Sequence, residues 1–322
     1  MKRRELLLSG LTCISSTAAL AANHSTKNPI LLIVPFSPGG LADNVARLLA
    51  DALLELKGHQ LIVINKPGAS GVIAALDVAN SQPTERKLMF TASTAALAIR
   101  QLKDERLNAL RTLQPLSGVG RQDSFLVVSE QIKSRNLKDF IDLLRSGFAS
   151  TYGSIGIGSV GHILGAAMIE RLGSDISHVP YKVSSLMMQD IARGNPTFSF
   201  CAYDVFRPFM EKQLVKPIAI ASAERSPLFP LVSTMREEGF KEVECQPWLA
   251  IYAPNHANDW LPTNIISDIN ETLSNPEIVL RLKSMNVEPF KLAGPKLNRF
   301  IDEDMRSWQS KWRRLSELGL LQ

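Results

Sequence analysis

The chain has 322 residues, a formal net charge of +5 and 45% hydrophobic residues. This length suits one large or two medium domains, and the apolar content is that of an ordinary globular protein. Lys and Arg are spread along the chain without a basic block, so we expect no nucleic-acid partner.

The N-terminal residues have the pattern of an export signal. A basic start, Lys2-Arg3-Arg4, precedes a short apolar segment from Leu6 to Leu20, and small residues follow at Ala19-Leu20-Ala21. We expect residues 1–21 to be a signal peptide that is cleaved near Ala21 or Ala22, and the mature protein to be exported; the resemblance described below implies the periplasm. An uncleaved anchor is the alternative, although the segment is short for a membrane span.

Cys201 and Cys245 remain after the predicted cleavage, whereas Cys13 leaves with the signal. The two thiols would face an oxidising compartment, where they could pair. A chain of this size buries enough core without a disulfide, so we expect two separate buried thiols.

Strand-like and helix-like segments alternate along most of the chain, which is typical of α/β layers with largely parallel sheets. The predicted strands are Ile30–Val34, Gln60–Asn65, Lys87–Thr91, Phe125–Ser129, Ser150–Ser154, Ile176–Tyr181, Thr197–Cys201 and Lys216–Ala221. The predicted helices are Leu41–Leu56, Gly71–Asn80, Leu137–Ser146, Ser159–Leu172, Ser184–Arg193 and Val205–Met210, and helices dominate from Pro262 to Leu320.

The strands fall in two similar halves, so we expect two sheets. Leu116–Phe125 is the predicted first crossing between domains, and Ala223–Pro230 is the second. Domain one then comprises residues 22–122 and 226–322, and residues 123–225 form an inserted domain two. Ligands of such folds bind in the cleft, at the carboxyl ends of the strands.

Four loops with glycines or hydroxyls stand where a strand ends and a helix begins. They are Pro38-Gly39-Gly40, Asn65 to Gly71, Thr91 to Thr94, and Tyr152 to His162. Helix N-termini offer unpaired N–H groups at the positive end of the helix dipole, which suits an anion. Lys66 is the exception among loops that otherwise lack cations. The pattern therefore favours carboxylate binding through neutral hydrogen bonds, although each loop alone could serve only to turn the chain.

Enzymatic alternatives find less support. Gly156-x-Gly158-x-x-Gly161 matches a dinucleotide fingerprint, but the preceding strand is polar and Asp175 comes before the next strand rather than at its end. No Gly-x-Ser-x-Gly surrounds Ser154 or Ser159, and the histidines lack metal-ligand spacing. We expect no catalytic residue, no metal site and no cofactor, and an exported serine hydrolase is the less favoured alternative.

Several single residues allow two interpretations. Asp43 is predicted to cap a helix and to pair with Arg47 one turn later. Asp204 either meets a ligand amine or a water, or caps a helix. Phe36 lines the cleft or belongs to the core. His162 contacts the ligand or supports the site from behind, and we favour the second.

Longer motifs resemble a known family. They are Pro35-Phe36-Ser37-Pro38-Gly39-Gly40-x-x-Asp43-x-x-Ala46-Arg47, Asn65-Lys66-Pro67-Gly68-Ala69-Ser70-Gly71, Tyr152-Gly153-Ser154-x-Gly156-x-Gly158-Ser159-x-x-His162, His178-Val179-Pro180-Tyr181-Lys182 and Ala223-Glu224-Arg225-Ser226-Pro227. Their order and spacing resemble the Bug-type periplasmic solute receptors of tripartite tricarboxylate transporters over essentially the whole mature chain. The sequence departs from the family at Ala42, where threonine is common, and at Val183, where glycine is usual.

The resemblance implies a type II periplasmic-binding-protein fold, in which two α/β domains with a two-crossing hinge enclose a ligand cleft. It implies no catalysis. It implies capture of a small organic acid for a membrane permease, most simply by a monomer; a ligand sensor for a membrane signalling protein such as a sensor kinase is the alternative. The implied ligand contacts are Phe36, Gly39, Gly40, Ala69 and Ser93 in domain one and Ser154, Gly158, Ser159 and Asp204 in domain two, with Pro38 of the first loop as a further candidate.

Overall fold

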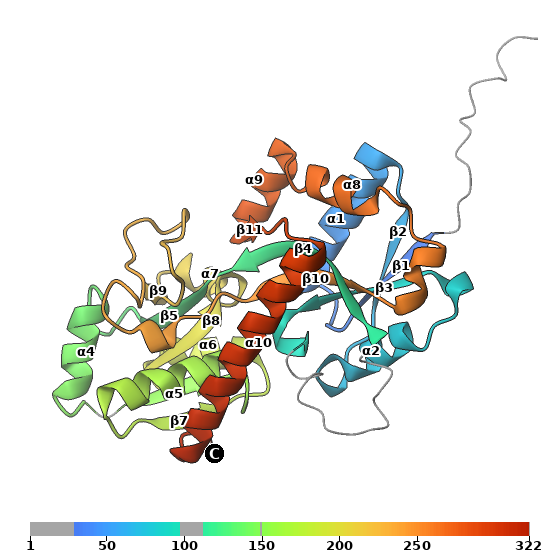
Figure 1. Cartoon of the computed structure of the whole chain (residues 1–322). Helices are drawn as coiled ribbons and strands as arrows, with labels where there is room; N and C mark the ends of the chain where they lie inside the picture. Colours follow the sequence, from blue (N-terminus) through green and yellow to red (C-terminus); the bar gives the residue numbers. More distant parts are fainter. Residues whose placement is uncertain (1–28, 97–111, 149, 322) are drawn as a thin grey trace, which may run out of the picture.

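The computed structural model describes residues 29–96, 112–148 and 150–321 (Figure 1). Within them two sheets carry helices on their faces, which confirms the predicted α/β fold with two sheets. The predicted signal peptide and its cleavage site lie outside the described residues. Among the helices that are described, none is long and apolar enough to cross a membrane.

The first sheet has the strand order β11-β4-β10-β3-β1-β2. Its strands are β1 (Ile30–Val34), β2 (Leu61–Asn65), β3 (Lys87–Ala92), β4 (Gln114–Gln122), β10 (Trp248–Ala253) and β11 (Val287–Pro289). Its helices are α1 (Leu41–Lys57), α2 (Val72–Ala79), α8 (Ile265–Thr272) and α9 (Pro276–Ser284). Because strand side chains alternate, Leu32 packs in the core under α1 and α8, whereas Ile33 packs on the opposite face under α2.

The second sheet has the order β7-β6-β8-β5-β9. Its strands are β5 (Ser124–Ser129), β6 (Thr151–Ser154), β7 (Ser177–Pro180), β8 (Phe198–Ala202) and β9 (Val215–Ile220). Its helices are α4 (Leu137–Arg145), α5 (Val160–Leu172), α6 (Ser184–Ala192) and α7 (Tyr203–Met210). Leu126 packs in the core under α4 and α5, and its neighbour Phe125 packs under α6 and α7. Cys201 and Cys245 are buried and unpaired, as predicted.

Both sheets are mixed, so the expectation of largely parallel sheets was wrong in part. The parallel pairs are β1 with β2 and β3, and β6 with β7 and β8. In the first sheet β10, β4 and β11 pair antiparallel, and in the second β5 is antiparallel to both neighbours. Three of these strands, β4, β10 and β11, were not predicted from the sequence.

The chain passes from one sheet to the other at Asp123, which stands between β4 and β5 within the predicted crossing segment. Asp123 is 7% exposed, and burial raises the pKa of its carboxyl, although hydrogen bonds with Ser226, Asn286 and Gln246 oppose this rise. Ser226 Oγ also donates to Asn286 Oδ1 at 2.8 Å. Since residue 226 follows β9 and residue 286 precedes β11, this buried polar cluster joins segments that belong to both sheets.

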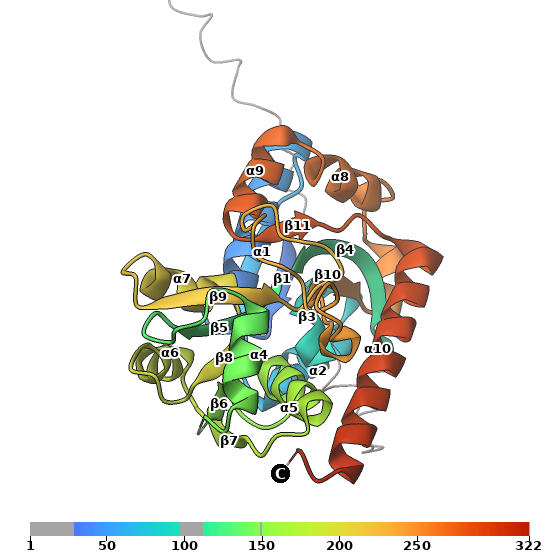
Figure 2. The same ribbon diagram turned by 90° about the vertical axis from the view of Figure 1, so that its left-hand side faces the viewer.

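The long helix α10 (Gly294–Glu317) also joins the two cores. Figures 1 and 2 show it running from the first sheet toward α5. Leu297 and Ile301 pack in the core of the first sheet, whereas Trp308 and Leu315 pack in the core of the second. The boundaries predicted for the two domains stay a prediction.

Candidate functional site

The first loop, between β1 and α1, is held by the carboxylate of Asp43. Asp43 Oδ2 accepts hydrogen bonds from Gly39 N at 2.9 Å and Arg47 Nε at 3.1 Å, and Asp43 Oδ1 accepts one from Asn65 Nδ2 at 2.9 Å. Burial alone would raise the pKa of Asp43, but these hydrogen bonds outweigh it and hold the pKa below its ordinary value. The predicted pairing of Asp43 with Arg47 is confirmed.

This network fixes what the first loop can offer a ligand. The Gly39 N–H already has a partner in Asp43, and the first intrahelical bond of α1 runs from Asn44 N to Gly40 O. The N–H groups from Gly40 to Asp43 therefore precede the helical hydrogen bonds and point out of the helix start. Pro38, Gly39 and Gly40 are exposed, and Phe36 is half-buried against the first core.

The second loop packs tightly between the first and third loops. Gly71 has φ +94°, and a Cβ there would lie 3.0 Å from the Ala95 Cβ and 3.4 Å from the Pro35 Cβ. Ala69, with φ +47°, is exposed beside it. Lys66 Nζ forms an ion pair with Asp77 Oδ2 at 2.8 Å, so the cation of this loop is neutralised within the protein.

The fourth loop, between β6 and α5, rests on two stacked histidines. Ser159 caps α5, because its Oγ accepts a hydrogen bond from His162 N at 3.3 Å, and Gly158 N donates to His162 Nδ1 at 3.1 Å. The rings of His162 and His178 stack with centroids 4.1 Å apart. Burial, together with the neighbouring His178, lowers the pKa of His162 to about 4, so the ring is neutral at neutral pH. His162 thus supports the loop from behind, as predicted.

Ser154 has a partner that its sequence neighbourhood did not indicate. Its Oγ lies 2.8 Å from His178 Nε2 and accepts a hydrogen bond from Gly156 N at 3.2 Å. Ser154 is only 1% exposed. Although a Ser–His contact also occurs in hydrolases, this serine is out of reach of a substrate, and the pair shapes the loop.

Asp204 lies in the first turn of α7, at the same edge of the second sheet. It is exposed to solvent, yet burial of its carboxyl by the surrounding protein raises its pKa, although N–H groups of Asp204 and Val205 oppose the rise.

Two predicted loops meet at one cavity. Ser93 and Thr94, which follow β3, line it together with Gly158, Val160 and Ile163 from the β6–α5 segment and Trp308 of α10. Its volume of about 20 Å³ holds about one water molecule and is too small for an organic acid. Phe36, Pro38, Gly39, Gly40, Ala69, Ser154, Ser159 and Asp204 do not line it. The sequence analysis did not single out Trp308 as a residue of the site, because in the sequence it is only one of the apolar residues along a helix.

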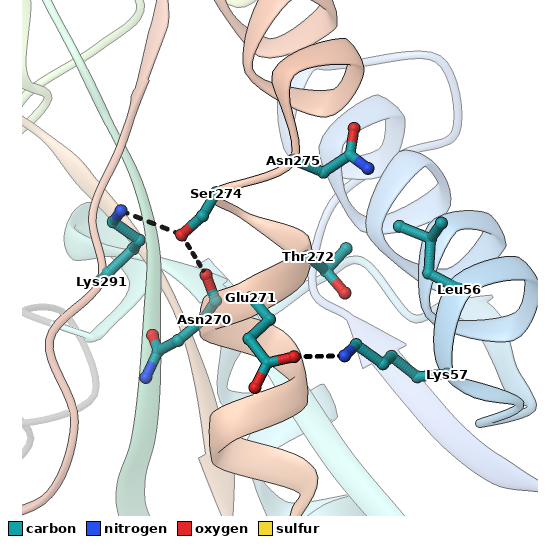
Figure 3. Close-up of a pocket in the computed structure, with 8 residues that line it drawn as sticks. All are labelled: Leu56, Lys57, Asn270, Glu271, Thr272, Ser274, Asn275 and Lys291. Carbon is teal, nitrogen blue, oxygen red and sulfur yellow. Dashed lines mark hydrogen bonds and ion pairs between the residues drawn. The ribbon is translucent and has the colours of Figure 1, made fainter.

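A larger hollow of about 640 Å³ lies elsewhere, between α1 and α8 (Figure 3). Lys57 forms an ion pair with Glu271 across it, and Lys291 Nζ donates to Ser274 Oγ at 3.0 Å. Lys57 is at the C-terminal end of α1, about 25 Å along the helix from the first loop. This hollow is therefore separate from the strand ends that carry the predicted loops.

Comparison with known proteins gives a consistent result. The family model described as tripartite tricarboxylate transporter family receptor matches residues 45–316. Protein BugT of Bordetella pertussis (strain Tohama I) is 29% identical over 313 residues, which cover 94% of this chain and 95% of BugT.

Solved structures show the same fold. R. palustris Rpa4515 with adipate has a TM-score of 0.75 and 25% identity, covering 89% of this chain and 97% of that one. The periplasmic binding protein BugD has a TM-score of 0.71 and 23% identity over the same shares. MatC (Rpa3494) of Rhodopseudomonas palustris with bound malate has a TM-score of 0.71 and 22% identity, covering 88% and 98%. The chain belongs to the family of tripartite tricarboxylate transporter receptors, which are substrate-binding proteins and not enzymes.

Proposed function

We propose that this periplasmic receptor captures a small carboxylated solute between its two sheets and delivers it to the membrane permease of a tripartite tricarboxylate-type transporter. Membership of the receptor family supports the first step. The R. palustris relatives were solved with adipate and with malate, which are both carboxylates. The paired cations Lys66 and Arg47 fit a site that holds its anion by neutral donors.

The observation that carries the proposal is that Ser93 and Gly158 line one cavity, although they follow strands of different sheets. Ser159 adds a hydroxyl whose oxygen accepts the capping bond from His162 N, which leaves its proton for a ligand. It also stands at the N-terminus of α5, where the helix dipole favours negative charge. A carboxylate at this point would contact both halves of the molecule.

The hydrogen bonds within the protein divide the predicted contacts into two roles. Gly39, Ser154 and Gly158 already have partners, so we assign them to shaping the loops. The carboxylate contacts are then Gly40, Ser93 and Ser159. Phe36, Pro38 and Ala69 form the wall on the first sheet, and Asp204 faces the ligand from the second.

Thermal unfolding with a panel of mono-, di- and tricarboxylates tests the proposal. An acid at about a hundred times its Kd stabilises the native state by about 2.7 kcal/mol, which raises the Tm by roughly 4 °C in a chain of this size. The matched controls are the corresponding amides, which keep the shape of each acid without its charge. A Tm unchanged by every acid in the panel would contradict the proposed function.

Uptake by cells that lack this protein tests the partner. We expect loss of uptake of the stabilising acid, with recovery when the gene is restored. Normal uptake together with a lost transcriptional response to the acid would instead support a receptor that works with a sensor kinase.

A further inference from the structure

Large aliphatic side chains are exposed at the edge of the second sheet that carries the proposed ligand loop. Ile155 is 59% exposed and Ile157 is 60% exposed, both between β6 and α5. Val183 is 47% exposed and Leu186 is 52% exposed, at the start of α6. Exposed apolar groups that gather in one place mark a binding surface more often than scattered ones do.

The two segments are neighbours because β6 and β7 run side by side in parallel. Ser154 pairs with Pro180, and Tyr181 N donates to Ser154 O at 2.8 Å. The loops that follow these strands therefore leave the sheet at the same edge. The first of them also contains Gly158, which lines a cavity with Ser93 of the first sheet.

The first sheet also has an exposed aliphatic side chain, and no unpaired cation among Lys66 and Arg47, at the edge that carries its loops. Ile73, in the first turn of α2, is 51% exposed and lies close to the second loop, since its Cδ1 would be 2.7 Å from a Cβ on Gly68. The cations of this edge, Lys66 and Arg47, are paired with Asp77 and Asp43. Because both cations already form ion pairs within the protein, neither is unpaired for a second carboxylate of a ligand.

We propose that the bound acid carries an extended alkyl chain, which packs on the exposed side chains of Ile155, Ile157 and Val183. This inference rests on the proposed function, because it assigns the remainder of a ligand whose carboxylate is held at Ser93 and Ser159. These side chains are assigned to the ligand, and not to a protein partner, because Ile155 and Ile157 belong to the same loop as Gly158 and Ser159, and the segment of Val183 follows the neighbouring parallel strand. Contact with the ligand would remove these side chains from water, which favours binding in proportion to the apolar area covered.

Two acid series measure this directly. Isothermal titration would compare straight-chain monocarboxylates from four to eight carbons, and dicarboxylates over the same lengths. We expect affinity to rise by about fourfold for each added methylene that is buried, until the chain covers Ile155, Ile157 and Val183. In Ile157→Ser and Val183→Ser this gain with length is reduced, while affinity for the shortest acid stays the same.

Leu231→Ser is the matched control, because Leu231 is 93% exposed on the segment between β9 and β10 and is as aliphatic as the tested residues. It should leave every affinity unchanged. Affinities that do not depend on chain length, or that change equally in all three variants, would overturn the inference and leave carboxylate binding intact. If no acid of any length binds, the proposed function itself fails.

Discussion

Asp43 illustrates how much of the first loop depends on one side chain. It is 2% exposed and accepts hydrogen bonds from a loop N–H, from Arg47 and from Asn65. The pairing with Arg47 could be predicted from a spacing of four residues. The bond to Gly39 could not, because it depends on the φ of +84° that glycine adopts there. The contact of Ser154 with His178 could not be predicted from the sequence for another reason, because 24 residues separate the two partners.

The stacked histidines predict how stability depends on pH. The pKa of His162 falls from 6.5 to about 4 in the folded protein, mainly through burial. Below pH 6.5 the unfolded chain binds a proton that the folded chain rejects. His162 therefore lowers the free energy of unfolding as the pH falls from about 6.5 to about 4, by roughly 3 kcal/mol.

The comparison with His162→Asn isolates this effect, because an Asn oxygen can still accept the hydrogen bond from Gly158 N. Asp123 and Asp304 have raised pKa values from burial, so their protonation stabilises the fold as the pH falls, in the opposite direction. We expect chemical denaturation between pH 7 and 4.5 to give a smaller loss of stability in the variant. Equal losses in both proteins would show that the imidazole does not contribute.

At the scale of elements, most strands with a local apolar pattern were predicted, although β10, with the sequence WLAIYA, was missed despite such a pattern. The strands β4 and β11 were missed because tertiary contacts set them. β4 contains Pro115 and two glycines, which are rare in strands. Its glycines are explained by close packing, since a Cβ on Gly118 would lie 2.6 Å from Phe290 O and one on Gly120 would lie 2.3 Å from Val287 Cγ1. The requirement for glycine at positions 118 and 120 becomes visible only when the position of β11 and of Phe290 after it is known.

The helix α10 yields a prediction about Trp308, which is 6% exposed, belongs to the second core and lines the cavity with Ser93. Trp308→Ala should lower the free energy of unfolding by about 3–5 kcal/mol, because it leaves a large void. Gln309→Ala, at the exposed neighbouring position, should change it by less than about 0.5 kcal/mol. Denaturant titration of both variants checks this. Similar small losses would mean that the indole does not hold the two halves together.

At the scale of the whole molecule, the two sheets are joined at Asp123, by the return between β9 and β10, and by α10. The cavity between them has room for about one water. Binding of an organic acid would therefore require the sheets to separate and close again, and a ligand can drive this only if it binds the closed arrangement better. The alternation of strands and helices was enough to predict two sheets and the edges that face each other. It did not predict how small the cavity between those edges is, because side chains distant in the sequence, such as Trp308 of α10, also line it.

The most direct test is a calorimetric titration of the most stabilising acid into the wild type, Ser93→Ala and Ser159→Asp. Ser159→Asp keeps a residue that caps α5 well but places a negative charge at the proposed carboxylate position. We expect roughly tenfold weaker binding in Ser93→Ala and undetectable binding in Ser159→Asp, while both variants unfold within about 1 kcal/mol of the wild type. Wild-type affinity in both variants would contradict a carboxylate site shared by the two sheets.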